Sequence, residues 1–151
     1  MDEGMTLPPV TVIAMDGTPM RLSDRPLPAV IYFYPKDDTS GCTREAQDFS
    51  TLADAFAAAG ASVVGISKDP PFSHGKFAAK HALTVTLASD EDGSACEAFG
   101  VWGEKQMYGR SYMGIERATF LFGADGRLVR AWRKVKVAGH AQAVLEAVQA
   151  L

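Results

Sequence analysis

Apolar and polar positions alternate along this chain in blocks whose spacing predicts strands and helices in turn. The run Ala29–Tyr34 is apolar, aromatic and β-branched, as expected for a buried strand. Apolar residues then recur at helical spacing from position 46 to position 56, which predicts a helix that begins near Cys42 and ends at about Ala59. The next apolar run, Ala61–Ser67, predicts a second strand. Strand, helix and strand at this spacing form a βαβ unit with a right-handed crossover.

The flanking regions predict two hairpins, three more helices and one more strand. Segments 10–14 and 20–22 should form a small N-terminal hairpin, because Asp16-Gly17 between them is a turn signal. Another hairpin should turn at Ala124-Asp125-Gly126. We expect its strands over 116–122 and 127–134, helices over 72–81, 94–100 and 140–151, and a further strand over 83–88.

Three segments carry weaker signals. Ser94-x-x-Glu97 has the form of a capping box, which should open the helix over 94–100. Residues 101–115 are punctuated by glycine and rich in Trp, Tyr and Met, so we expect them to be irregular. Residues 1–6 have the character of a loose N-terminal extension. The chain contains no repeat, linker or low-complexity tract, so we expect residues 1–151 to form a single α/β domain.

Composition and charge narrow the function classes. With 151 residues, 47% of them hydrophobic and 22% charged, the chain can bury a core of ordinary size. The net charge is −3 and the basic residues are scattered, so we expect no nucleic-acid or anionic-membrane partner, and the basic run 130–136 indicates a solvated edge strand. We see neither a signal peptide nor an apolar run of membrane-spanning length. Two cysteines without pairing spacing indicate a reducing compartment, so we expect a cytoplasmic protein.

Histidine positions give no sign of a metal site. His74, His81 and His140 have neither mutual spacing nor pairing with cysteine of the kind that zinc requires. We therefore interpret all three as surface residues and expect no bound metal.

The candidate chemistry lies where the first buried strand gives way to its helix. Pro35 ends the strand, the segment 39–41 (Thr-Ser-Gly) offers turn and N-cap residues, and Cys42 then falls in the first helical turn. Unpaired backbone N–H groups and the positive end of the helix dipole favour a thiolate there. A buried structural cysteine is the ordinary alternative, but polar neighbours and this backbone position favour a reactive one.

The segment around Cys42 resembles a known family. Pro35-x-x-x-Thr39-x-x-Cys42 is similar to the active-site signature of the peroxiredoxins, and the string from position 32 to position 45 resembles their PrxQ, or bacterioferritin comigratory protein, subgroup. Further matches at 101–105, 107–110 and 113–120 extend the similarity over nearly the whole chain from about residue 7. The resemblance implies a thioredoxin-like fold, a central mixed sheet flanked by helices, with an N-terminal β-hairpin. It also implies a thiol-dependent peroxidase of antioxidant defence and cell redox homeostasis, which needs no metal or organic cofactor.

The chemistry of peroxide reduction gives the candidate residues their roles. A thiolate attacks one oxygen of the O–O bond while negative charge grows on the leaving oxygen. Cys42 supplies the sulfur, Thr39 can turn its hydroxyl toward the thiolate or the peroxide, and the first N–H groups of the helix are fixed donors. By resemblance, Arg117 favours the thiolate and stabilises the transition state. By the same resemblance, Pro35 shields the pocket from water and Glu45 orients an arginine. Without the resemblance, Arg117 would be interpreted as an arginine at a strand end.

The chain departs from the subgroup at two places. Ser40 replaces a proline often found there, which loosens the turn but removes no reacting group. Many PrxQ proteins carry a resolving cysteine where this chain has Gln47, and others place it in the next helix, whose segment 77–80 has none. Cys96, on a short apolar helix, is expected to pack in the core, with a resolving role as the alternative. We therefore expect Cys42 to form a sulfenic acid that an external thiol reduces. That donor would be thioredoxin, glutaredoxin or a small thiol, and the protein a monomer or weak homodimer.

Other cysteine enzymes fit less well. A thioredoxin-like disulfide oxidoreductase would need Cys-x-x-Cys, and position 45 is Glu. A cysteine phosphatase or arsenate reductase would place an arginine where Asp48 stands, and a carboxylate would repel the anion. A thiol-based peroxide sensor or redox interaction protein with slow turnover remains open, because the usual resolving cysteines are absent.

Overall fold

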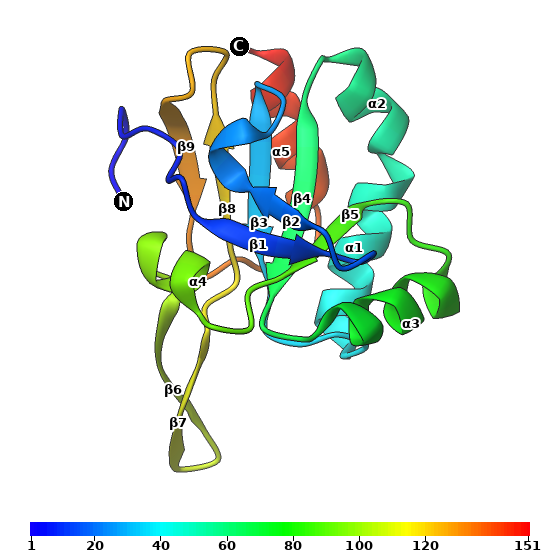
Figure 1. Ribbon diagram of the computed structural model, residues 1–151, viewed down its shortest axis with the longest axis vertical. Coiled ribbons are helices and arrows are strands. Elements are labelled where there is room, and N and C mark those ends of the chain that lie inside the picture. Colours follow the sequence, from blue (N-terminus) through cyan, green and yellow to red (C-terminus); the bar gives the residue numbers. More distant parts are fainter.

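A seven-stranded mixed sheet forms the centre of the protein in a computed structural model that describes residues 1–151. The strand order is β2-β1-β5-β4-β3-β8-β9 (Figure 1). These strands are β1 (Thr11–Ala14), β2 (Pro19–Arg21), β3 (Ala29–Phe33), β4 (Ser62–Ser67), β5 (Thr86–Ser89), β8 (Ala118–Phe122) and β9 (Leu128–Trp132). The helices are α1 (Ser40–Thr51), α2 (Ala53–Ala58), α3 (Pro71–His81), α4 (Ser94–Ala98) and α5 (His140–Gln149), with a 3-10 turn over Leu22–Asp24.

The βαβ unit has the predicted arrangement. β3 and β4 run parallel, with Ala29 opposite Ser62 and Phe33 opposite Ile66. On its other side β3 pairs antiparallel with β8. All five residues of β3 are buried, because side chains cover both faces of this central strand. The two predicted hairpins also form: β1 pairs antiparallel with β2, and β8 with β9.

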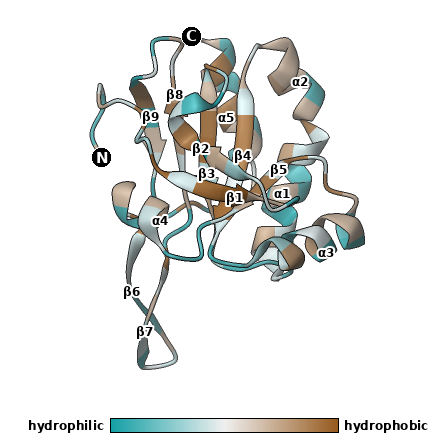
Figure 2. Ribbon diagram, in the orientation of Figure 1, coloured by the Kyte–Doolittle hydropathy of each residue, from teal (hydrophilic) through white to brown (hydrophobic).

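Two apolar clusters make up the core. Successive residues of a strand point to opposite faces, so Tyr32 belongs to one cluster and Phe33 to the other. The cluster around Tyr32 includes residues of α1, α2, α3 and α5, whereas the cluster around Phe33 includes residues of α4 and the N-terminal segment. Figure 2 shows the hydrophobic colour concentrated on the strands of the sheet. Cys42 lies in the first cluster and Cys96 in the second, so the two cysteines belong to separate parts of the core.

The helix predicted to run from Cys42 to about Ala59 is in fact two helices. α1 ends at Thr51 and α2 begins at Ala53, because Leu52 leaves helical geometry with φ −94° and ψ 7°. The buried apolar positions on either side of Leu52 nevertheless keep helical spacing, with Phe49 and Phe56 in one aromatic contact. Hydrophobic periodicity therefore predicts the buried face correctly and does not detect the bend.

The segment expected to be irregular is a third hairpin, which forms a separate two-stranded sheet. β6 (Trp102–Met107) and β7 (Arg110–Ile115) pair antiparallel and extend away from the body of the protein (Figure 1). Tyr108 and Gly109, both with positive φ, form the two-residue turn that right-twisted hairpins favour. Most of the hairpin is exposed on both faces, so its sequence lacks the alternation that predicts a half-buried strand.

Two further expectations are wrong. Residues 1–6 are not a loose extension: Thr6 forms a bridge with Arg127, and the Gly4 N–H donates to the Leu128 carbonyl at 2.8 Å. Ser94 and Glu97 do not form a capping box, because Gly93 is the N-cap of α4. The carboxylate of Asp90 instead accepts the N–H groups of Ala95 and Cys96, and it does the capping from outside the helix. None of the helices has the length and apolar character that crossing a bilayer would require.

Candidate active site

Cys42 lies in the first turn of α1, beyond the carboxyl end of β3, as the sequence predicted. Its side chain is 2% exposed. Thr39 is the N-cap residue, with φ −90° and ψ 155°, and its carbonyl accepts the N–H of Thr43 in the first turn. The sulfur therefore lies at the end of the helix where unpaired N–H groups and the dipole favour negative charge.

Arg117 connects the sulfur to a buried carboxylate. Its Nη2 donates to Sγ of Cys42 at 3.3 Å, and its Nη1 donates to Oε1 of Glu45 at 2.7 Å. Arg117 immediately precedes β8, and its backbone is fixed because its carbonyl accepts the N–H of Val135. A Cβ on Gly41 would lie 3.2 Å from Nη2, so the glycine leaves room for the guanidinium. One planar fork thus holds both an acidic side chain and the candidate nucleophile.

The charges in this group depend on one another. Glu45 is 1% exposed, and burial raises its pKa to about 7, although Arg117 opposes the shift. Burial disfavours the charge on Arg117, but Glu45 and then Cys42 outweigh it and raise the pKa of the guanidinium. Glu45 Oε2 has no hydrogen-bond partner. Arg117 therefore keeps its positive charge in this site, and the negative charge of Glu45 depends on the ion pair with Arg117.

Thr39 and Pro35 occupy the rim of the site. The hydroxyl of Thr39 donates to the carbonyl of Lys36 at 2.9 Å, so in this structure it points into the loop and makes no hydrogen bond to the sulfur. Pro35 is half-buried and lines a cavity of about 490 Å³ together with Arg117, Val101 and Trp102. A small molecule in this cavity would contact Arg117, whereas the lining includes neither Cys42 nor Thr39.

Cys96 is packed in the core, as the sequence analysis expected. Its side chain is fully buried in the cluster opposite that of Cys42. Burial, followed by the neighbouring Asp90 carboxylate, raises the pKa of Cys96 well above its ordinary value. A thiol in this environment is protonated and a poor nucleophile.

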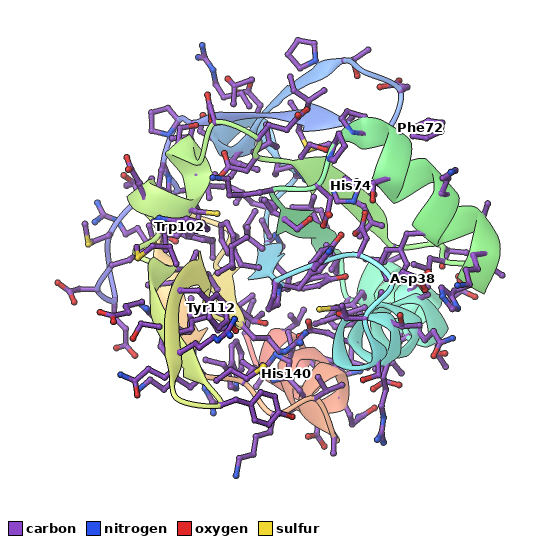
Figure 3. All side chains as sticks on the ribbon, turned by 90° about the horizontal axis from the view of Figure 1, so that it is seen from below. Asp38, Phe72, His74, Trp102, Tyr112 and His140 are labelled. Carbon is purple, nitrogen blue, oxygen red and sulfur yellow. The ribbon has the colours of Figure 1, made fainter.

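The interpretation of the histidines as surface residues is wrong for two of the three. His74 is fully buried between α3 and the sheet, and His140 is 7% exposed at the start of α5 (Figure 3). His74 Nδ1 lies 2.8 Å from Oδ2 of Asp37, and His140 Nε2 lies 2.8 Å from Oγ1 of Thr119. A signal was available for His74, because it lies one helical turn before the inward-facing Phe77. Its partner Asp37 could not be predicted, since it lies in a distant part of the chain.

Comparisons with known proteins show which family this chain is similar to. The AhpC/TSA family model matches residues 4–131. The Peroxiredoxin Bcp of Xanthomonas campestris pv. campestris is 54% identical over 121 residues, which are 80% of this chain and 76% of that protein. The Peroxiredoxin Bcp of Bacillus subtilis is 45% identical over 149 residues, which are 98% of this chain and 93% of that protein.

Solved structures extend the likeness to the fold. The Xanthomonas campestris bacterioferritin comigratory protein, studied for its alkyl peroxide reduction activity, has a TM-score of 0.89 at 46% identity, covering 99% of this chain and 98% of that one. Peroxidoxin BcpB from Mycobacterium tuberculosis has a TM-score of 0.87 at 34% identity, covering 100% and 98%. The expected thioredoxin-like fold is thereby confirmed. By sequence and structure alike, the chain belongs to the AhpC/TSA family as a peroxiredoxin of the Bcp, or PrxQ, group, whose members are thiol-dependent peroxidases.

Proposed function

We propose that this peroxiredoxin reduces hydrogen peroxide and organic hydroperoxides through Cys42, with Arg117 as the activating cation. The observation that carries the proposal is the 3.3 Å contact between Nη2 of Arg117 and Sγ of Cys42, in a site where the sulfur is 2% exposed. A fixed positive charge beside the sulfur favours the thiolate, which is the nucleophilic form.

The first step forms a sulfenic acid. The Cys42 thiolate attacks one peroxide oxygen, an S–O bond forms as the O–O bond breaks, and the other oxygen leaves as water or an alcohol after taking a proton. Negative charge moves from sulfur to the leaving oxygen, so a donor that reaches both atoms stabilises the transition state more than the reactants. Arg117 is suited to this role, since its guanidinium contacts the sulfur and the residue also lines the adjoining cavity.

Glu45 and Pro35 support this step. Glu45 holds one end of the guanidinium through its 2.7 Å ion pair, which keeps the other end directed at the sulfur. Pro35 lines the cavity beside Arg117, where it has no N–H to offer and limits the access of water. Thr39 would contribute if its hydroxyl turned from the Lys36 carbonyl toward bound peroxide. The reaction requires no metal or organic cofactor.

The second step uses a thiol from another molecule. Gln47 stands where many relatives of this kind carry a resolving cysteine, and Cys96 is fully buried in the opposite core cluster. A donor thiol attacks the sulfenic sulfur and water leaves. A second thiol then attacks the donor sulfur of the mixed disulfide, so the donor departs as a disulfide and Cys42 is reduced. Thioredoxin, glutaredoxin or a small cytoplasmic thiol would serve, acting on a monomer or a weak homodimer.

A peroxide sensor with slow turnover is the second candidate. The feature that favours it is the burial of Cys42, because a thiol donor cannot reach a sulfur that is 2% exposed without a local opening. A steady-state assay with peroxide and a thiol donor separates the two functions. An enzyme turns over repeatedly, whereas a sensor consumes one equivalent of peroxide and stalls.

Replacing Cys42 by Ser tests the central claim. The variant should fold as the wild type does and lose peroxide reduction, whereas Cys96→Ser, the matched control, should keep it. Retained activity in folded Cys42→Ser would refute the proposal.

A further inference from the structure

A buried polar cluster lies behind the active-site loop, which we define as residues 35–41. At its centre is His74 of α3, whose side chain is fully buried (Figure 3). Its Nδ1 lies 2.8 Å from Oδ2 of Asp37, a residue of the active-site loop. Its Nε2 lies 3.0 Å from the carbonyl oxygen of Ala88 in β5. The reaction proposed above makes no use of this cluster.

Short polar contacts connect His74 to the loop and to the sheet. Its Nδ1 lies 2.8 and 3.0 Å from the two carboxylate oxygens of Asp37 and 3.2 Å from the Tyr34 hydroxyl, while its Nε2 faces the Ala88 carbonyl oxygen. Asp37 also accepts the hydroxyl of Tyr34 at 2.6 Å and that of Ser73 at 2.7 Å. Burial disfavours its charge, but these three side-chain hydrogen bonds outweigh burial and hold the pKa of Asp37 below its ordinary value.

The loop has a second, weaker attachment to α3 on its outer side. Asp38 pairs there with Lys80 and with His81, at 2.7 Å in each case. The side chain of Asp38 is 42% exposed, and exposed pairs of this kind contribute little to stability. Asp37 and Asp38 are adjacent, and both contact α3. The buried contact of Asp37 and the exposed contacts of Asp38 can therefore be compared by mutation.

The proposed cycle makes two different demands on this loop. A peroxide is small enough to reach Arg117 through the adjoining cavity while Cys42 stays 2% exposed. A protein thiol is not, so the loop and the first turn of α1 must move before a donor can reach the sulfur. Openings of this size occur in folded proteins with free energies below that of global unfolding.

We propose that the His74–Asp37 pair holds the active-site loop closed and so sets how often Cys42 becomes accessible to a thiol. His74 is thus a positioning residue for the second half of the cycle. The inference rests on the proposed function only in taking Cys42 as the sulfur that a donor must reach. Removing His74 leaves the buried Asp37 carboxylate with only the Tyr34 and Ser73 hydroxyls as side-chain partners, and opening the loop relieves this by admitting water. The opening equilibrium therefore rises.

The experiment measures the accessibility of Cys42 in native His74→Asn. The asparagine amide keeps a donor toward Asp37 but carries no charge and cannot reach Ala88. Reduced protein reacts with a bulky aromatic disulfide reagent, and intact and peptide masses report each cysteine separately. We expect the Cys42 labelling rate to rise at least about tenfold over wild type. Oxidation of Cys42 by hydrogen peroxide, which needs no loop opening, should change less than about threefold.

Three controls separate local opening from other effects. Cys96 is fully buried in the other cluster, so its labelling should not change unless the whole domain is destabilised. Asp38→Asn removes the outer pair and should change Cys42 labelling by less than about twofold. Ser73→Ala removes one neutral donor to Asp37, so a smaller rise is expected even if His74→Asn fails to fold.

Several outcomes would overturn the inference. Unchanged Cys42 labelling in folded His74→Asn would do so, as would an equal rise at Cys42 and Cys96, or an equal effect of Asp38→Asn. A parallel rise in peroxide oxidation would show altered sulfur reactivity in place of opening. If His74→Asn does not fold, unchanged labelling in Ser73→Ala overturns the inference. Failure of the proposed function would give a different result. Wild-type Cys42 would then not be oxidised by peroxide, while the difference in Cys42 labelling between wild type and His74→Asn could still be measured.

Discussion

Replacing Arg117 by Met should remove most of the acceleration that the site gives to peroxide reduction. The guanidinium is 3.3 Å from the Cys42 sulfur and its side chain is only 16% exposed, so water screens the interaction weakly. A hydrogen bond to a charged group contributes about 1.5–3 kcal/mol, and one donor to a developing oxyanion contributes about 2.7–4 kcal/mol. Since about 1.4 kcal/mol is a factor of ten, we expect the second-order rate constant to fall about 10²- to 10³-fold.

The same substitution leaves Glu45 without its partner, so it needs a control. An unpaired buried carboxylate destabilises the fold, and burial already raises the pKa of Glu45 to about 7. The double variant Arg117→Met/Glu45→Gln removes that carboxylate, and Glu45→Gln alone supplies the reference that retains the arginine. Comparing the double variant with Glu45→Gln measures the effect of the guanidinium alone, because neither protein contains an unpaired Glu45 carboxylate.

The assay is single-turnover oxidation of reduced protein. Rapid mixing with excess hydrogen peroxide, acid quenching and intact mass give the rate at which Cys42 gains one oxygen. The fall should appear in both Arg117→Met and the double variant, and it should be smaller in Glu45→Gln. If the double variant and Glu45→Gln oxidise at the same rate across neutral pH, Arg117 does not act on the sulfur and the reasoning is refuted.

The remaining predictions concern Cys96, the core and pH. Dimedone should label peroxide-treated Cys42 equally in wild type and in Cys96→Ser; labelling lost in wild type alone, with a monomer mass lower by two hydrogens, would show that Cys96 resolves. Gly65→Ala should cost about 1–3 kcal/mol in urea unfolding, because the added Cβ would collide with the ring of Tyr32; an unchanged midpoint would contradict this. Burial lowers the pKa of His140 from 6.5 to about 4, so the unfolded chain binds the extra proton in that window and stability should fall as pH drops through it. His140→Gln should flatten this dependence, and equal pH slopes in both proteins would disprove it.

Local sequence pattern predicted the parts of the fold that are buried on both sides. β3 is apolar along its length, β4 is mainly apolar between its terminal serines, and the turn between β3 and α1 carries its own polar signals, so the position of Cys42 followed from the chain. The β6–β7 hairpin escaped prediction because it buries little of either face. The bend at Leu52 escaped because the apolar stripe continues across it.

The partners within the site lie beyond the reach of any local pattern. Arg117 and Cys42 are 75 positions apart, and before folding nothing distinguishes this arginine from others at strand ends. Only the resemblance to a family selected it. His74 and Asp37 are 37 positions apart and no local pattern connects them, so the sequence does not predict the buried pair. Contacts between charges distant in sequence depend on the sheet order, which brings together the ends of β3, β4 and β8.

In the proposed cycle a closed sulfur must react with an outside reductant, and the two requirements oppose each other. Exclusion of water strengthens the field of Arg117 at Cys42, so a more closed loop favours reaction with peroxide. The same closure blocks the thiol that must reduce the sulfenic acid. A neutral hydrogen bond at the base of the loop would hold it weakly, and a fully apolar contact would give it no fixed geometry. The buried His74–Asp37 pair is rigid while intact but costly to leave half-broken, so the loop tends toward either a closed or an open state. The balance between these states would decide how turnover divides between oxidation and reduction.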